Sequence, residues 1–130
     1  MKRDGKTVVI DNFWLSYQLY IDALAKDFEG SIIHDLAEID RLTIEWPDIV
    51  IFLSLSEQGI RDFIKRGARE FDQSEDFIQN QALPIHKLHD VFFSREDIKE
   101  RVISVPRDKL DFADEKDFKG LVEKIDSFKN

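Results

Sequence analysis

Cysteine is absent from the 130 residues, which excludes disulfide bonds and thiolate metal sites and favours a reducing compartment. Long apolar runs are absent as well. The longest, Ile49–Leu53, is far shorter than the roughly 20 residues that a helix needs to span a bilayer. The charged start, Met1–Lys6, is not followed by the apolar stretch of a secretory signal. We therefore expect a cytoplasmic protein that does not cross a membrane.

An excess of positive charge is also missing. The chain carries 19 Lys and Arg against 27 Asp and Glu, a net charge of −8. Nucleic acids and anionic membranes bind basic surfaces, so neither is expected as a partner. This balance still leaves room for a local basic pocket that binds a polyanion such as ATP.

The chain is rich in apolar residues. They make up 42% of the sequence and include eleven Phe, which indicates a packed interior rather than a disordered chain. A length of 130 residues suits one compact domain. No internal repeat, low-complexity segment or linker interrupts the sequence, so a single domain over residues 1–130 is expected.

Three β-branched runs predict buried strands: Thr7–Ile10, Ile49–Leu53 and Val102–Val105. Helical spacing of apolar residues fills the intervals between and after them. Strands that alternate with helices predict an α/β fold, with a short parallel sheet of about three strands flanked by helices. The expected helices are 13–28 ended by Gly30, one from Ser31 to before Trp46, one from Ser56-Glu57, 74–93 with a kink at Pro84, and 114–128.

Ligands in open α/β sheets bind beyond the carboxyl ends of the strands. Polar residues follow the expected strands at Asp11-Asn12, Ser54–Ser56 and Pro106–Phe112. The charged stretch Lys65–Gln73 is a second candidate, because its two arginines lie beside a glycine and guanidinium groups match the oxygens of phosphate. The alternative for this stretch is a solvated helix end.

Other motifs give weaker indications of function. His86 and His89 lie three residues apart on an expected helix, as half of a metal site or as surface or packing histidines. Gly5-Lys6-Thr7 imitates the end of a phosphate-binding P-loop, GxxxxGK[ST], but it precedes an expected strand instead of following one, so we interpret it as coincidence. The signatures GxSxG and HExxH are absent.

Four segments form a larger pattern. Val8–Asn12 reads VVIDN, Pro47–Leu53 reads PDIVIFL, Ile64–Gln73 reads IKRGAREFDQ, and Lys109–Phe112 reads KLDF, with LVEKI at Leu121–Ile125. In this order and spacing they resemble the deoxynucleoside kinase family and, more distantly, thymidylate kinases. The corresponding family segments are a strand ending in Asp-Arg or Glu-Arg, a PDLVIYL strand, an IKKRGREYEQ lid, and an LDF or EDF adenine loop with its closing helix.

The resemblance covers nearly the whole chain. It implies a P-loop-kinase-like three-layer fold and ATP-dependent phosphoryl transfer to a deoxynucleoside, with ATP and Mg²⁺ as cofactors. The roles it implies are Arg66 and Arg69 as lid arginines on the transferring phosphates, Asp11 near the substrate 5′-hydroxyl and the metal, Asp72 on the sugar hydroxyl, Tyr17 at a base-reading position, and Asp111 and Phe112 against adenine.

The chain also departs from the family pattern. Asn12 stands where the family has Arg, and Ala68 is a one-residue insertion between the lid arginines. The family's first strand and P-loop match nothing here, so the chain is expected to correspond to the part after them. Two hypotheses follow. One is a kinase that acts only if another chain supplies the P-loop or if this sequence is part of a longer gene product. The other is a non-catalytic, kinase-derived binding or scaffold subunit, inactive as an isolated chain and paired with such a partner or with itself as a homo-oligomer.

Overall fold

The computed structural model describes residues 5, 7–11, 14–24, 28–67 and 74–129. The chain divides into two compact units, Met1–Glu45 and Trp46–Asn130. The expectation of a single domain over the whole chain stays a prediction, since separate contact clusters do not say how the units function together.

The first unit contains two helices, α1 (Trp14–Leu24) and α2 (Phe28–Arg41). Leu15 and Leu19 of α1 are buried. The prediction that Gly30 ends the first helix is wrong, because Gly30 lies inside α2 and is buried there. A glycine in a helix costs roughly 0.5–1 kcal/mol relative to alanine, but its missing Cβ allows close approach at a buried position.

The predicted strand at Thr7–Ile10 is also wrong. These residues are not part of a strand, and Val9 and Ile10 are 89% and 66% exposed. β-Branched residues favour a strand only where a neighbouring strand pairs with their backbone and a core covers their side chains. Among the described residues the sheet therefore has two strands rather than about three.

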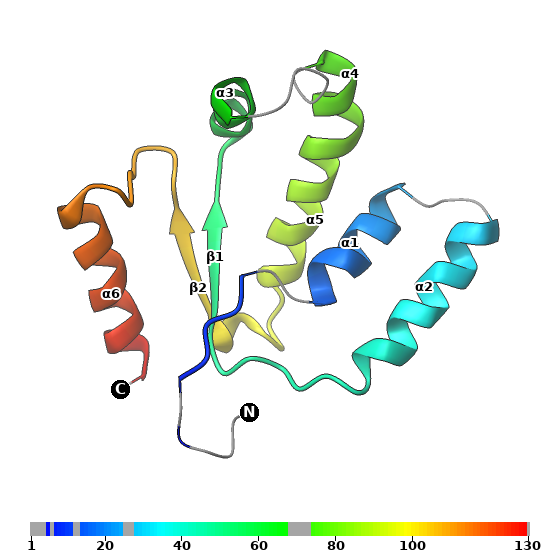
Figure 1. Ribbon diagram of the computed structural model, residues 1–130, viewed down its shortest axis with the longest axis horizontal. Coiled ribbons are helices and arrows are strands. Elements are labelled where there is room, and N and C mark those ends of the chain that lie inside the picture. Colours follow the sequence, from blue (N-terminus) through cyan, green and yellow to red (C-terminus); the bar gives the residue numbers. More distant parts are fainter. Residues whose placement is uncertain (1–4, 6, 12–13, 25–27, 68–73, 130) are drawn as a thin grey trace. The chain divides into compact units, whose positions relative to one another are not determined.

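The second unit is built on that sheet. Strands β1 (Val50–Ser54) and β2 (Val102–Pro106) run parallel, with Val50 opposite Val102 and Ser54 opposite Pro106 (Figure 1). Both strands were predicted, and the fold class is confirmed at the level of an α/β protein with a short parallel sheet. The P-loop-kinase-like three-layer arrangement stays a prediction.

Helices flank this sheet within the second unit. The predicted helix from Ser56-Glu57 is confirmed, as is the one near the carboxyl terminus. The irregularity expected at Pro84 takes the form of a π-helical stretch just before it, where Leu83 N donates to Ile78 O. Proline has no N–H for the helical ladder, and a π-turn accommodates such a break. The elements are α3 (Glu57–Gly67), α4 (Glu75–Phe77), the π-helix η3 (Ile78–Ala82), α5 (Leu83–Phe93), the 3₁₀-helix η4 (Lys99–Arg101) and α6 (Glu115–Lys129).

The core of the second unit is aliphatic and aromatic. The ring of Phe52 on β1 lies 4.8 Å from that of Phe93 on α5. Burial of such side chains is the main favourable term in folding. This burial holds α3, η3 and α5 against the sheet. The loops that follow β1 and β2 therefore start from fixed positions. The buried apolar residues of this unit are Val50, Ile60, Ile78, Ile85, Phe93, Ile98, Ile103 and Val105.

Candidate functional site

The loops that follow β1 and β2 meet at one edge of the sheet. Because the strands are parallel and in register, both chains leave the sheet at the same end. The first backbone contact beyond the strands is a hydrogen bond from Arg107 N to Ser54 O at 2.8 Å. The carboxyl edge of the sheet is therefore a continuous surface made by two loops distant in sequence.

Asp108 fastens these two loops together. Its carboxylate accepts hydrogen bonds from the Ser56 backbone N–H at 3.1 and 3.2 Å and from the Ser56 hydroxyl. The Ser56 hydroxyl in turn accepts from Gly59 N at 3.0 Å, as an N-cap of α3 does. The hydrogen bond from the Ser56 side chain holds the pKa of Asp108 below its ordinary value. Asp108 thus joins the β2 loop to the first turn of α3.

A cavity of about 200 Å³ lies between α3 and these loops. Its lining includes Arg66 in the last turn of α3 and Arg107 and Asp111 in the loop after β2. Three carboxylates and two guanidinium groups line it in all, the further carboxylates being those of Asp62 and Asp108. The lining is therefore mixed in charge rather than uniformly basic.

The carboxylates of this lining have donors within the protein. Asp62 accepts from Gln58 Nε2 at 2.9 Å, and Asp111 accepts from Ala113 N at 3.0 Å. Asp108 is occupied by Ser56. Each of these carboxylates thus accepts a hydrogen bond from a neighbouring donor of the same chain.

Arg107, unlike these carboxylates, contacts aromatic rings. Its guanidinium carbon lies 4.9 Å from the ring centroid of Phe63 and 5.4 Å from that of Phe112, so that it contacts two aromatic faces. Both distances are within the roughly 6 Å range of a cation–π interaction. No carboxylate among the described residues lies within ion-pair distance of it. The sequence placed Arg107 within the candidate range Pro106–Phe112, directly after an expected strand, but gave it no role of its own.

Arg66 is exposed and lies at the same cavity. In the part of the chain that the structure describes, its guanidinium also has no carboxylate partner. The two arginines therefore offer donors that no acidic side chain of the described residues takes up. Guanidinium groups without a carboxylate partner suit the phosphate or carboxylate of a ligand.

The structure brings together only part of the predicted site. Arg66 and Asp111 line the cavity, and Phe112 lies beside it through Arg107. Tyr17 is 69% exposed on α1, and Asp11 is exposed as well; both belong to the first unit. Arg69 and Asp72 lie outside the described residues, so their predicted roles stay predictions.

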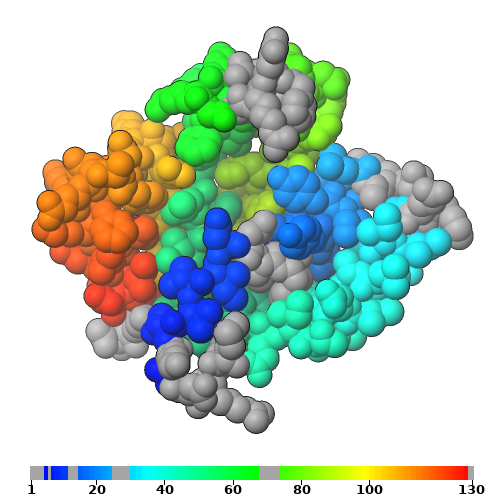
Figure 2. Space-filling view, viewed as in Figure 1, coloured from blue at the N-terminus to red at the C-terminus, as the bar shows by residue number. Residues whose placement is uncertain are grey.

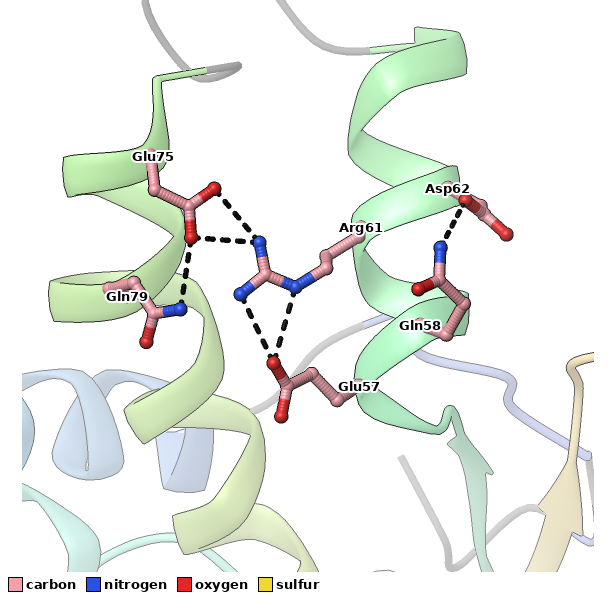
Figure 3. A network of polar contacts seen from close by, with 6 residues as sticks. All are labelled: Glu57, Gln58, Arg61, Asp62, Glu75 and Gln79. Carbon is pink, nitrogen blue, oxygen red and sulfur yellow. Dashed lines mark hydrogen bonds and ion pairs between the residues drawn. The ribbon is translucent and has the colours of Figure 1, made fainter.

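Arg61 makes a polar network on the side of α3 that faces α4 (Figure 3). Its Nη1 lies 2.9 Å from both carboxylate oxygens of Glu75, and its Nε and Nη2 donate to Glu57 at 3.2 and 3.1 Å. Gln79 donates to Glu75 at 2.9 Å. Hydrogen bonds from Gln79 and Arg61 hold the pKa of Glu75 below its ordinary value, and those to Glu75 and Glu57 raise the pKa of Arg61. This network joins α3 to α4. The donors of Arg61, unlike those of Arg66, are therefore taken up by contacts within the protein.

The two histidines of α5 pack against the sheet. The rings of His86 and His89 have centroids 5.9 and 6.4 Å from that of Phe52. Leu55 N donates to His86 Nε2 at 3.3 Å, next to the cavity wall. These contacts agree with the packing interpretation. Over the described ranges, no group of three or more His, Asp or Glu side chains is placed to hold a metal ion.

Comparison of the chain with models of known protein families, with curated proteins and with solved structures found no match. Within the described segments, no helix combines the length and the apolar character needed to span a bilayer.

Proposed function

We propose that the unit Trp46–Asn130 binds a phosphate-bearing ligand of the nucleotide class at the carboxyl edge of β1 and β2. The observation that carries the proposal is the pair Arg66 and Arg107 at one cavity, neither with a carboxylate partner among the described residues. Ligands of α/β sheets bind at this edge, and arginine donors match phosphate oxygens.

The resemblance to deoxynucleoside kinases supports a nucleotide as the ligand. Arg66 stands at the position of a lid arginine, and Asp111 and Phe112 stand at that of the adenine loop. These residues come from two segments far apart in sequence, and they gather around one cavity. ATP with Mg²⁺ is accordingly the first ligand to test.

The size of the cavity limits what it encloses to part of a nucleotide, such as its phosphates. At about 200 Å³ it is smaller than the roughly 300–1,000 Å³ of pockets that enclose small ligands. Phosphoryl transfer depends on positioning by a P-loop, its lysine and Mg²⁺, and no GxxxxGK[ST] sequence occurs in the 130 residues. We therefore propose a deoxynucleoside-kinase-like binding subunit whose phosphoryl transfer, if restored, requires a P-loop from outside these 130 residues, such as that of a partner chain.

Isothermal titration calorimetry with ATP–Mg²⁺ tests the binding. We expect Arg66→Ala and Arg107→Ala each to weaken the affinity about tenfold, because a hydrogen bond to a charged group contributes roughly 1.5–3 kcal/mol. Arg95→Ala is the matched control: Arg95 pairs with Asp97 at 2.7 Å and lies over Phe92, away from the cavity lining. Its affinity should equal that of the wild type.

The absence of heat at millimolar ATP–Mg²⁺ would overturn the proposal, as would equal affinity in Arg66→Ala, Arg107→Ala and the wild type. Incubation with ATP and deoxynucleosides should release no ADP from the isolated chain. ADP formation would instead favour the catalytic hypothesis.

A further inference from the structure

Helix α2 packs on α1 through its polar side. His34 Nε2 lies 3.2 Å from Asp22 Oδ1 on α1, and Gln18 of α1 donates to Glu38 of α2. Gly30 is buried on this same side of the helix. On the α2 side, the contact thus includes polar residues and a glycine, whereas in the usual arrangement the apolar stripe faces the neighbour.

Three of the exposed apolar residues of α2 lie on another side. Ile32, Leu36 and Ile39, hereafter the α2 stripe, follow the spacing i, i+4, i+7 and are 48%, 61% and 63% exposed. Figure 2 shows α2, in cyan, at the surface of the face drawn. Contiguous apolar residues at a surface mark interaction sites. A helix groove of a partner is the usual complement to anchors at this spacing.

The rim of the α2 stripe is negative. With roughly 100° per residue, Asp35 and Asp40 lie on opposite sides of the stripe, each about 70° from its centre. The Asp35 side chain is 79% exposed and lies 3.7 Å from His34 Nδ1. Arg41, the arginine of this helix, is already paired with Glu38 at 2.9 Å. The charge that borders the α2 stripe is therefore acidic on both sides.

We propose that the α2 stripe is the docking surface for a basic amphipathic helix of another protein. Such a helix would place apolar residues at i, i+4 and i+7 on the stripe and Lys or Arg residues against Asp35 and Asp40. Charge complementarity excludes a second copy as the better occupant, because a second α2 would place its own aspartates at the same rim. The net charge of −8 adds to that repulsion.

A pair of designed peptides tests the proposal on the full chain. Both are labelled helical peptides of about five turns with one leucine stripe. One carries Lys beside the stripe and the other carries Glu at the same positions. By fluorescence anisotropy, we expect the Lys peptide to bind about tenfold or more tightly than the Glu peptide, because like charges across an interface are unfavourable.

Charge reversal provides the decisive comparison. The double variant Asp35→Lys with Asp40→Lys should reverse the preference between the two peptides. The double variant Glu100→Lys with Glu123→Lys changes the net charge equally, at exposed positions of η4 and α6, and should keep the wild-type preference. Leu36→Asp should abolish binding while its circular dichroism stays that of the wild type.

Two results would overturn the proposal. One is an unchanged preference in the Asp35/Asp40 variant, which would mean that the acidic rim does not select the partner. The other is a dimer in sedimentation analysis that Leu36→Asp dissociates, which would assign the α2 stripe to a second copy. ATP binding at the carboxyl edge of the sheet is measured separately, so this proposal and that one fail independently.

Discussion

Gly59 and Gly120 both lie in helices, but their surroundings differ. A Cβ on Gly59 would overlap Asp108 Oδ1, whereas nothing lies within 4 Å of one on Gly120. Gly59 therefore leaves room for the Asp108 carboxylate that joins the β2 loop to α3. This close approach explains a glycine at the third residue of a helix, where it is unfavourable by propensity.

We predict opposite effects of alanine at these two positions. Gly120→Ala should raise the free energy of unfolding by about 0.5–1 kcal/mol, because alanine is the better helix former and space is available. Gly59→Ala should lack this gain or lower stability, since the added methyl displaces Asp108 from Ser56. Urea denaturation of both variants measures the difference. Equal stabilisation in the two would contradict the proposed role of Asp108.

Arg66 and Arg107 show which features of a site residue can be predicted from the sequence and which cannot. Arg66 was predicted from its charged stretch, and the structure places it at the cavity. Arg107 was predicted only as one of the polar residues of Pro106–Phe112, because its significance comes from its contacts with the rings of Phe63 and Phe112. Those two rings lie on different elements, so no local sequence pattern predicts that both contact Arg107.

At the scale of elements, the run from α4 through η3 to α5 begins at a capping serine. The Ser74 hydroxyl accepts a hydrogen bond from Phe77 N at 3.1 Å, and Ser74 has extended backbone angles. Arg61 then holds Glu75 in the first turn of this run. The start of the run is thus fixed by a cap and by the network that joins it to α3.

Removal of the cap should destabilise the protein. We expect Ser74→Ala to lower the free energy of unfolding by about 1 kcal/mol, the typical cost of losing an N-cap. Ser127→Ala is the matched control, since the Ser127 hydroxyl bonds the Glu123 carbonyl inside α6 and does not cap the start of that helix. Thermal unfolding of both variants makes the comparison, and equal losses would contradict the capping role.

Elements were predicted best where the signal was local. β1, β2, α3 and α6 each carry their apolar pattern within a few consecutive residues, and all four were recognised. Thr7–Ile10 has the composition of a strand, yet a strand also needs a partner for its backbone. The two helices of the first unit were recognised, but not their boundary, because a buried glycine inside a helix resembles a helix end in sequence.

At the scale of the whole molecule, the net charge is the dominant feature. A value of −8 is spread over both units, and even the cavity lining holds more carboxylates than guanidinium groups. The local donors of Arg66 and Arg107 thus act within a negative field. That field favours small ligands that reach the arginines directly over extended polyanions.

The protein is therefore expected not to bind DNA or RNA. In gel-shift assays at about 0.15 M salt, micromolar protein should leave duplex and single-stranded probes unshifted, because non-specific binding depends on neutralising phosphates with a basic surface. The two four-charge variants designed for the α2 stripe serve as comparisons. A shift with the wild-type chain would contradict the prediction.

The amino-acid sequence by itself determined the α/β class, the positions of strands β1 and β2 and the end of the sheet at which a ligand is expected, since these follow from periodicity and from the geometry of parallel strands. Only the tertiary structure decided that Thr7–Ile10 is unpaired, that Arg107 lies between two rings, and that the apolar stripe of α2 is exposed. The physical reason is the same in each case. A sequence pattern specifies which side chains share a face, whereas their burial, pairing and charge partners depend on elements brought together from distant parts of the chain.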